Sequence, residues 1–144
     1  MQDAGFQDRF AIRELIDRYS DSLNRRDYQT MASLFQPDAT WEAGGPYGIR
    51  LEGAAIAKSI GEMVGGFRFL IQMVQGVVVE LDGDRARART TIREVAAGAG
   101  GEPGLDNLGI YNDEVVRTPA GWRFQSRRFE PVYMDVRPLG GTVL

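Results

Sequence analysis

The chain has 144 residues, of which 43% are hydrophobic and 10% aromatic, and its formal net charge is −3. This length and composition suit one globular domain with its own core, so we expect residues 1–144 to form a single domain. Histidine and cysteine are both absent. Their absence excludes imidazole bases, thiolate nucleophiles, disulfides and Cys/His zinc sites, so we expect no metal centre. Lys58 is the one lysine and therefore the sole candidate for a Schiff base.

The opening segment and the charge distribution limit the classes of partner that we expect for this protein. Residues Met1–Gly5 lack a basic segment followed by an apolar one, so we expect no secretory signal. No apolar run approaches the ~18 residues of a membrane-spanning helix, and we expect a cytoplasmic protein with no membrane partner. Mild acidity and the mixing of both charge signs argue against a nucleic-acid partner, because phosphate binding needs a concentrated basic face.

The first 37 residues have the spacing of two helices. Apolar residues recur every three or four positions over 6–23, which predicts an amphipathic helix that ends near Asn24. Asp27 is a suitable N-cap for a short second helix that includes Phe35 and stops at Pro37.

The next segment predicts a short hairpin followed by a third helix. Residues 39–42 can form a short strand, and the chain returns over 47–52 after a turn rich in glycine and proline. Residues 54–64 predict the third helix, which two glycines close.

The second half of the chain predicts long strands. Residues 67–81 are rich in apolar and β-branched side chains. They are followed by an Asp-Gly-Asp turn at residues 82–84, which favours a hairpin with residues 85–94. A second hairpin joins 105–117 to 122–131. For the tail from Val132 onward we expect order only through packing on a neighbour. Helices followed by an antiparallel meander predict an α+β fold, in which a curved sheet leaves a ligand-sized mouth beside the first helix.

The strand over 85–94 alternates cleanly. One face carries Arg85, Arg87, Arg89, Thr91 and Arg93, and the other carries Ala86, Ala88, Thr90, Ile92 and Glu94. We interpret the arginine face as solvated or subunit-facing rather than as a nucleic-acid patch.

Several short motifs occur in the order and spacing of a known family. They are Ala11–Tyr19 (AIRELIDRY), Leu23–Asp27 (LNRRD), Leu34–Trp41 (LFQPDATW), Val79–Ala86 (VELDGDRA), Gly109–Arg117 (GIYNDEVVR), Gly121–Phe124 (GWRF) and Arg127. Together they resemble the SnoaL-like, scytalone dehydratase-like branch of the nuclear transport factor 2-like superfamily. The resemblance covers nearly the whole chain. It implies a cone-shaped fold in which three N-terminal helices pack on a curved antiparallel sheet.

The resemblance also implies an activity and an assembly. Relatives include scytalone dehydratase, hexachlorocyclohexane dehydrochlorinase, ketosteroid isomerase and non-catalytic proteins, so the implied site is a proton-transfer pocket without a cofactor. Homodimers or homotrimers through the outer sheet face are implied as well. The dehydratase-like members pair an Asp with a His, and those positions here hold Asn24 and Gln72. Both are amides that cannot exchange a proton near neutral pH.

Proton transfer therefore falls to other residues, and Glu94 and Tyr19 are the candidates. The alternation places Glu94 on the inner face, where an apolar setting would raise its pKa toward a useful range. The alternative is that the strand frays after Ile92 and Glu94 is solvated. The resemblance implies that Tyr19 points into the cavity, and the alternative is an ordinary core tyrosine.

Arg127 is the third catalytic candidate. It matches the position at which dehydrochlorinase-like members place an arginine to stabilise negative charge. Strict alternation from Phe124 would turn Arg128 inward instead, so Arg127 reaches the cavity only if a bulge intervenes. The alternative is a surface ion pair of Arg127 with Glu130 or Asp113.

Further residues are candidates for binding the substrate. They are Asn24, Trp41, Tyr47, Gln72, Asn107 and Tyr111. Asn24 is also a good helix C-cap, whereas Gln72 lies in an apolar run and needs partners if it is buried.

The leading hypothesis is a cofactor-independent lyase of dehydratase or retro-aldol type. It would act on a small hydroxylated aromatic or polycyclic molecule, with Glu94 or Tyr19 moving the proton and Arg127 stabilising charge. The alternatives are a non-catalytic small-molecule-binding protein, which the loss of the Asp/His pair favours, and an isomerase or cyclase.

Overall fold

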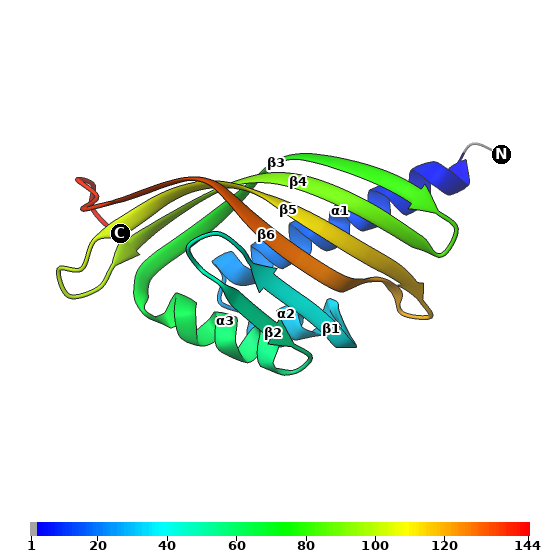
Figure 1. Cartoon of the computed structure of the whole chain (residues 1–144), viewed down its shortest axis with the longest axis horizontal. Coiled ribbons are helices and arrows are strands. Elements are labelled where there is room, and N and C mark those ends of the chain that lie inside the picture. Colours follow the sequence, from blue (N-terminus) through cyan, green and yellow to red (C-terminus); the bar gives the residue numbers. More distant parts are fainter. Residues whose placement is uncertain (1–2) are drawn as a thin grey trace.

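The computed structural model describes residues 3–144. The segment in which we expect no secretory signal, residues 1–5, therefore lies partly outside the described residues. Three helices and six strands follow one another along the chain (Figure 1). Their bounds are α1 (Asp3–Asn24), α2 (Tyr28–Ser33), β1 (Phe35–Ala43), β2 (Ile49–Glu52), α3 (Ala55–Gly65), β3 (Phe67–Asp82), β4 (Arg85–Gly98), β5 (Gly104–Thr118) and β6 (Gly121–Arg137).

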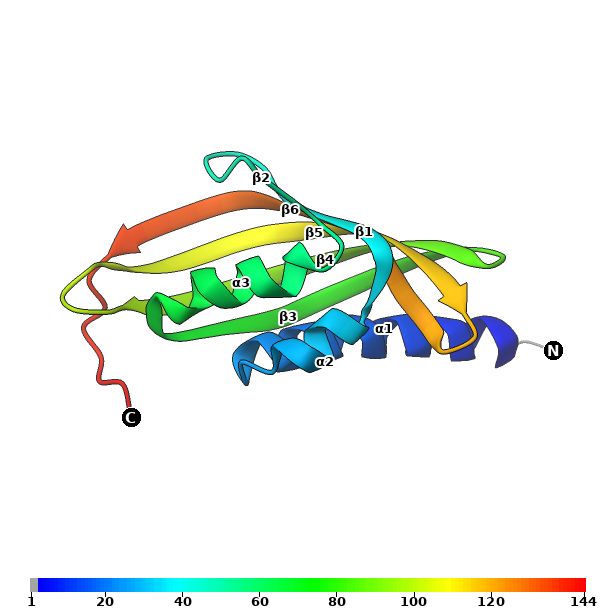
Figure 2. The ribbon, with the colours of Figure 1, turned by 90° about the horizontal axis from the view of Figure 1, so that it is seen from below.

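The strands form one curved sheet in the order β2-β1-β6-β5-β4-β3. The helices lie together on its concave side (Figures 1 and 2), and the apolar core fills the space between the two layers. The predicted α+β fold is confirmed. The sheet is mixed rather than wholly antiparallel, because β1 and β6 pair in parallel. No helix in the described part of the chain is both long and apolar enough to cross a membrane.

The helix that begins after Asp27 is shorter than predicted. Asp27 is its N-cap as expected, and its carboxylate accepts a hydrogen bond from the Thr30 N–H at 3.1 Å. However, Phe35 and Pro37 belong to β1 and not to the helix. Phe35 lies beside Phe124 of β6, and this sheet contact outweighs the local helical spacing.

Side chains of α1 and of the residues just after it cover the outer edge of β3, the edge that has no neighbouring strand. Because β3 is the last strand of the sheet, one row of its carbonyl groups has no neighbouring strand. Side chains from α1 and from the residues that follow it donate to these carbonyls. The pairs are Arg9 with Val79, Arg13 with Val77, Asn24 with Gln72, and Arg26 with Phe67. This edge is therefore closed by the helix rather than open to another chain.

The alternation predicted for β4 is confirmed. Its arginines are exposed, while Ala86, Ala88, Thr90 and Ile92 are buried against the helices. The strand continues to Gly98, so Glu94 lies within it and is not frayed.

The last strand is longer than predicted, and it contains the bulge that the arginine assignment required. Val132 does not begin an unpaired tail, because β6 runs to Arg137 and pairs with β5 over that stretch. The register of β5 and β6 shifts between Glu114 and Val115. This irregularity turns Arg127 inward and leaves Arg128 exposed.

Candidate functional site

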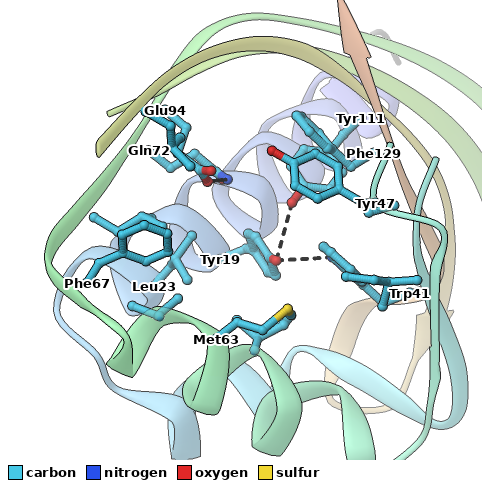
Figure 3. A pocket seen from close by; sticks show the side chains of 16 residues that line it. Tyr19, Leu23, Trp41, Tyr47, Met63, Phe67, Gln72, Glu94, Tyr111 and Phe129 are labelled. Atoms are coloured by element: carbon cyan, nitrogen blue, oxygen red, sulfur yellow. Dashed lines mark hydrogen bonds between the residues drawn. The ribbon is translucent and has the colours of Figure 1, made fainter. Parts of the chain in front are cut away.

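A cavity lies between the concave face of the sheet and α1 and α3, where the resemblance places a pocket (Figure 3). Its volume is about 130 Å³. Its walls are mostly apolar and include six aromatic side chains, namely Tyr19, Trp41, Tyr47, Phe67, Tyr111 and Phe129. Met63 of α3 is 39% exposed and lines the same cavity, so the opening to solvent lies near α3.

Glu94 is the one charged side chain among the described residues that line this cavity. It stands directly opposite Gln72 across the β3–β4 pair, and the Gln72 Nε2 donates a hydrogen bond to Glu94 Oε2 at 3.0 Å. Burial raises the pKa of the Glu94 carboxyl, and the amides of Gln72 and Asn107 only partly oppose this. A carboxyl of this kind can accept or release a proton closer to neutral pH than a solvated one.

Gln72 is itself held by two residues of α1. The Ser20 hydroxyl donates to Gln72 Oε1 at 2.9 Å. The Asn24 side chain bonds the Gln72 backbone twice: its Oδ1 accepts from the N–H at 2.7 Å, and its Nδ2 donates to the C=O at 3.0 Å. Asn24 thus uses both of its polar atoms on the protein, and it does not line the cavity.

Tyr19 is the centre of a hydroxyl and indole cluster on the other side of the cavity. Its hydroxyl accepts a hydrogen bond from Trp41 Nε1 at 3.2 Å and lies 3.4 Å from the Tyr111 hydroxyl, as Figure 3 shows. Burial raises the pKa of both phenols above the usual range. Both hydroxyls are therefore protonated at neutral pH and can donate to a ligand.

Arg127 lies behind this cluster and not in the cavity wall. Its guanidinium carbon is 4.3 Å from the Tyr19 ring centroid and 3.8 Å from that of Tyr111. It forms a buried bidentate pair with Asp113, with Nε–Oδ1 at 2.9 Å and Nη2–Oδ2 at 3.2 Å. Arg127 therefore pairs with Asp113, which was one of its two predicted partners. The pair is buried, however, so the prediction of a surface ion pair is wrong. Any action of Arg127 on a ligand has to pass through the two phenol rings.

Tyr47 and Asn107 form a third polar contact beside the cavity. The Asn107 Nδ2 donates to the Tyr47 hydroxyl at 2.8 Å. Tyr47 lines the cavity, whereas Asn107 is fully buried behind it and its Oδ1 has no hydrogen-bond partner.

The structure brings most of the predicted site residues to one cavity. Those that line it are Tyr19, Trp41, Tyr47, Gln72, Glu94 and Tyr111. Those that stand behind its wall are Asn24, Asn107 and Arg127, so direct substrate contact by these three is not supported by their positions.

Sequence reasoning missed Ser20 and the buried role of Asp113. Asp113 shares the inward parity of Tyr111 and Val115 on β5, so a charged residue on a buried face was the available signal. Ser20 lies four residues before Asn24, and nothing in the sequence marks its contact with Gln72.

Chemically, the cavity offers one carboxyl opposite a group of neutral hydroxyl and indole donors. Among the side chains that the structure describes, residues 5–144, no group of three acidic residues comes together that could hold a metal ion. The arrangement suits proton transfer and hydrogen bonding to a small ligand.

Comparison with known proteins connects this site to a family. The model of the SnoaL-like domain matches residues 5–128. The uncharacterised protein Rv2910c of Mycobacterium tuberculosis is 30% identical over 125 residues, which are 86% of this chain and 85% of that protein.

Solved structures share the fold. A candidate scytalone dehydratase from Novosphingobium aromaticivorans superposes with a TM-score of 0.84 at 20% identity, covering 99% of this chain and 100% of its own. A hexachlorocyclohexane dehydrochlorinase, LinA-type3 from Novosphingobium barchaimii, gives a TM-score of 0.82 at 19% identity, covering 96% and 94%. At these identities the similarity concerns the fold alone.

Proposed function

The chain belongs to the SnoaL-like domain family, and from that premise we propose that it is a cofactor-independent lyase acting on a small hydroxylated aromatic molecule. The reaction is an elimination of water, or a retro-aldol cleavage that uses the same groups. The observation that carries the proposal is the position of Glu94, a carboxyl of raised pKa that faces an apolar cavity opposite the Tyr19 hydroxyl.

In the elimination, the Glu94 carboxylate removes a proton from a substrate carbon. The electron pair of the broken C–H bond forms the new double bond, and the neighbouring C–O bond breaks. Tyr19 gives its hydroxyl proton to the departing hydroxide, which leaves as water. The proton on Glu94 returns to the Tyr19 phenolate through solvent, so the enzyme ends unchanged.

Arg127 supports this step without touching the substrate. Its guanidinium lies over the ring of Tyr19, and a cation there favours the phenolate that forms when the proton leaves. Asp113 holds the guanidinium in place.

The cavity also limits the substrate. Its size of about 130 Å³ is close to that of a cavity of about 150 Å³ known to hold benzene, which favours a single ring over a polycyclic molecule. Because Glu94 is the sole charge that lines it among the described residues, an uncharged substrate is favoured over an anion.

The fold neighbours named as a dehydrochlorinase and a candidate dehydratase give the same class of chemistry by analogy. A cytoplasmic location and a homodimer or homotrimer remain predictions.

The test is to incubate the protein, without cofactors, with hydroxylated single-ring compounds and to follow products by mass spectrometry. Loss of the mass of water, or cleavage into two carbonyl fragments, supports the proposal. Binding of these compounds with no turnover by the wild-type protein means that it is a binding protein and not a lyase.

A further inference from the structure

Two residues near the end of α1, Ser20 and Asn24, hold the residue that contacts Glu94. We propose that they are positioning residues, which fix Gln72 so that its amide N–H faces Glu94 and holds the carboxylate toward the cavity. This inference rests on the proposed function, because it assigns a purpose to the precise placement of Glu94. It adds Ser20 to the site and gives Asn24 a role other than substrate contact.

The first part of this clamp acts on the side chain of Gln72. A glutamine amide has one acceptor oxygen and one donor nitrogen, and the two can exchange places by rotation of the amide. The Ser20 hydroxyl donates to the oxygen at 2.9 Å, and the nitrogen is thereby directed to Glu94 at 3.0 Å. Ser20 and Gln72 are both buried, with 5% and 3% exposure, so bulk water has little access to either side chain.

The second part acts on the backbone of Gln72. Asn24 follows Ser20 by four residues and therefore lies on the same face of α1. It bonds both the N–H and the C=O of Gln72, which point away from β4 toward the free edge of β3. Gln72 and Glu94 are consequently a non-hydrogen-bonded pair of the antiparallel ladder, in which opposite side chains lie closest.

The clamp selects one protonation state of Glu94. An ionised carboxylate can only accept hydrogen bonds, so it is favoured by the nitrogen of Gln72 and not by its oxygen. When Ser20 no longer holds the oxygen, the amide can turn and present that oxygen to protonated Glu94. Loss of the Ser20 hydroxyl thus favours the protonated carboxyl.

The other titratable groups that face Glu94 do not interfere with this test. They are Tyr19 from α1, Tyr47 from the β1–β2 connection and Tyr111 from β5. Burial raises the pKa of each phenol above its usual range, so all three stay neutral while Glu94 titrates.

The experiment is a ¹³C NMR titration of the Glu94 carboxyl, assigned by its disappearance in Glu94→Gln. Ser20→Ala should raise the titration midpoint by about half a pH unit to one pH unit. Ser20→Thr restores a hydroxyl and should titrate like the wild type. Ser22→Ala is the matched control, because Ser22 is a buried serine of α1 whose hydroxyl donates to the Tyr19 carbonyl instead.

A second variant keeps the inference testable if Ser20→Ala does not fold. Gln72→Met removes the amide altogether and should raise the midpoint at least as far. An unchanged or lowered midpoint in Ser20→Ala, or in Gln72→Met when only that variant folds, overturns the clamp. The titration needs no substrate, so an absence of turnover defeats the lyase proposal and leaves this result standing, whereas an unchanged midpoint defeats the clamp alone.

Discussion

The amide nitrogen of Gln72 lies 3.0 Å from the carboxylate of Glu94, across the pair of strands β3 and β4. The family resemblance implies a histidine at position 72 and an aspartate at position 24, and this chain has an amide at both. The cavity nevertheless retains a carboxyl, on the neighbouring strand and facing inward. In the proposed function, the acid/base group therefore lies one strand away from the position that the resemblance implies. The Asn24 side chain bonds the backbone of Gln72, whose side-chain amide in turn contacts Glu94.

The raised pKa of Glu94 makes stability depend on pH. Because burial raises this pKa in the folded state, the folded protein keeps the proton over a window in which the unfolded chain has released it. Stability therefore falls as pH rises from about 4.3, the unfolded value, through the folded pKa. The glutamine side chain in Glu94→Gln cannot ionise, so this variant does not lose stability in this way as pH rises.

We expect the stability of Glu94→Gln relative to the wild type to increase from pH 4 to pH 8, by about 1.4 kcal/mol for each pH unit by which the pKa is raised. Urea denaturation at several pH values measures this difference. Glu130→Gln makes the same substitution at an exposed residue and is the comparison variant. A constant difference between Glu94→Gln and the wild type across this range contradicts the assignment.

Asp113 should contribute strongly to stability because it neutralises a buried cation. Asp113→Ala leaves the Arg127 guanidinium without its partner inside the core, which we expect to cost about 3–5 kcal/mol of unfolding free energy. The double variant Asp113→Leu with Arg127→Met removes both charges and should recover most of this loss. Asp106→Ala breaks an exposed pair with Arg93 and should have a much smaller effect. Equal losses in the buried and exposed variants would contradict this account.

The cavity should discriminate against anions. At pH 8, benzyl alcohol should bind at least tenfold more tightly than benzoate, because benzoate places a second negative charge beside Glu94. The indole N–H signal of Trp41, which lines the cavity, should report binding in two-dimensional NMR, while that of Trp122 stays fixed. Glu94→Gln should reduce the difference in affinity between benzyl alcohol and benzoate. A wild-type protein that binds benzoate more tightly than benzyl alcohol would contradict the proposed substrate class.

The hydroxyl of Tyr19 should matter for turnover more than for folding. Tyr19→Phe keeps the ring over Arg127 and removes the proposed proton donor, so kcat should fall about a hundredfold or more. Steady-state kinetics on a substrate from the product screen measure this. Tyr133→Phe, on an exposed residue of β6, is the control. If both variants turn over like the wild type, Tyr19 is not the acid.

Much of the fold could be predicted because local patterns and tertiary packing agree. The alternation of Arg85 through Glu94 placed Glu94 on the inner face, and Asp27 marked the start of α2. The same reasoning extended α2 to Phe35 wrongly, because the pairing of β1 with β6 is a contact between distant parts of the chain. Periodicity within a segment carries no information about such a partner.

The site was harder to predict for the same reason. Glu94 could be found from its position on an alternating strand, and the family resemblance implied the position of Tyr19. The inward turn of Arg127 depends on a register shift near Glu114 that alternation alone cannot reveal. That Asn24 bonds the backbone of Gln72 rather than a ligand depends on how α1 packs against β3, and the sequence of neither element specifies it.

The central claim is that Glu94 is the general base of a lyase. Its most direct test is kcat/KM as a function of pH for the wild type and Glu94→Gln, on the best substrate of the product screen. We expect wild-type kcat/KM to rise with pH through a midpoint above the ordinary glutamate value, and Glu94→Gln to be slower by about a hundredfold or more with that rise absent. A Glu94→Gln variant with wild-type kcat/KM and the same pH profile would contradict the claim.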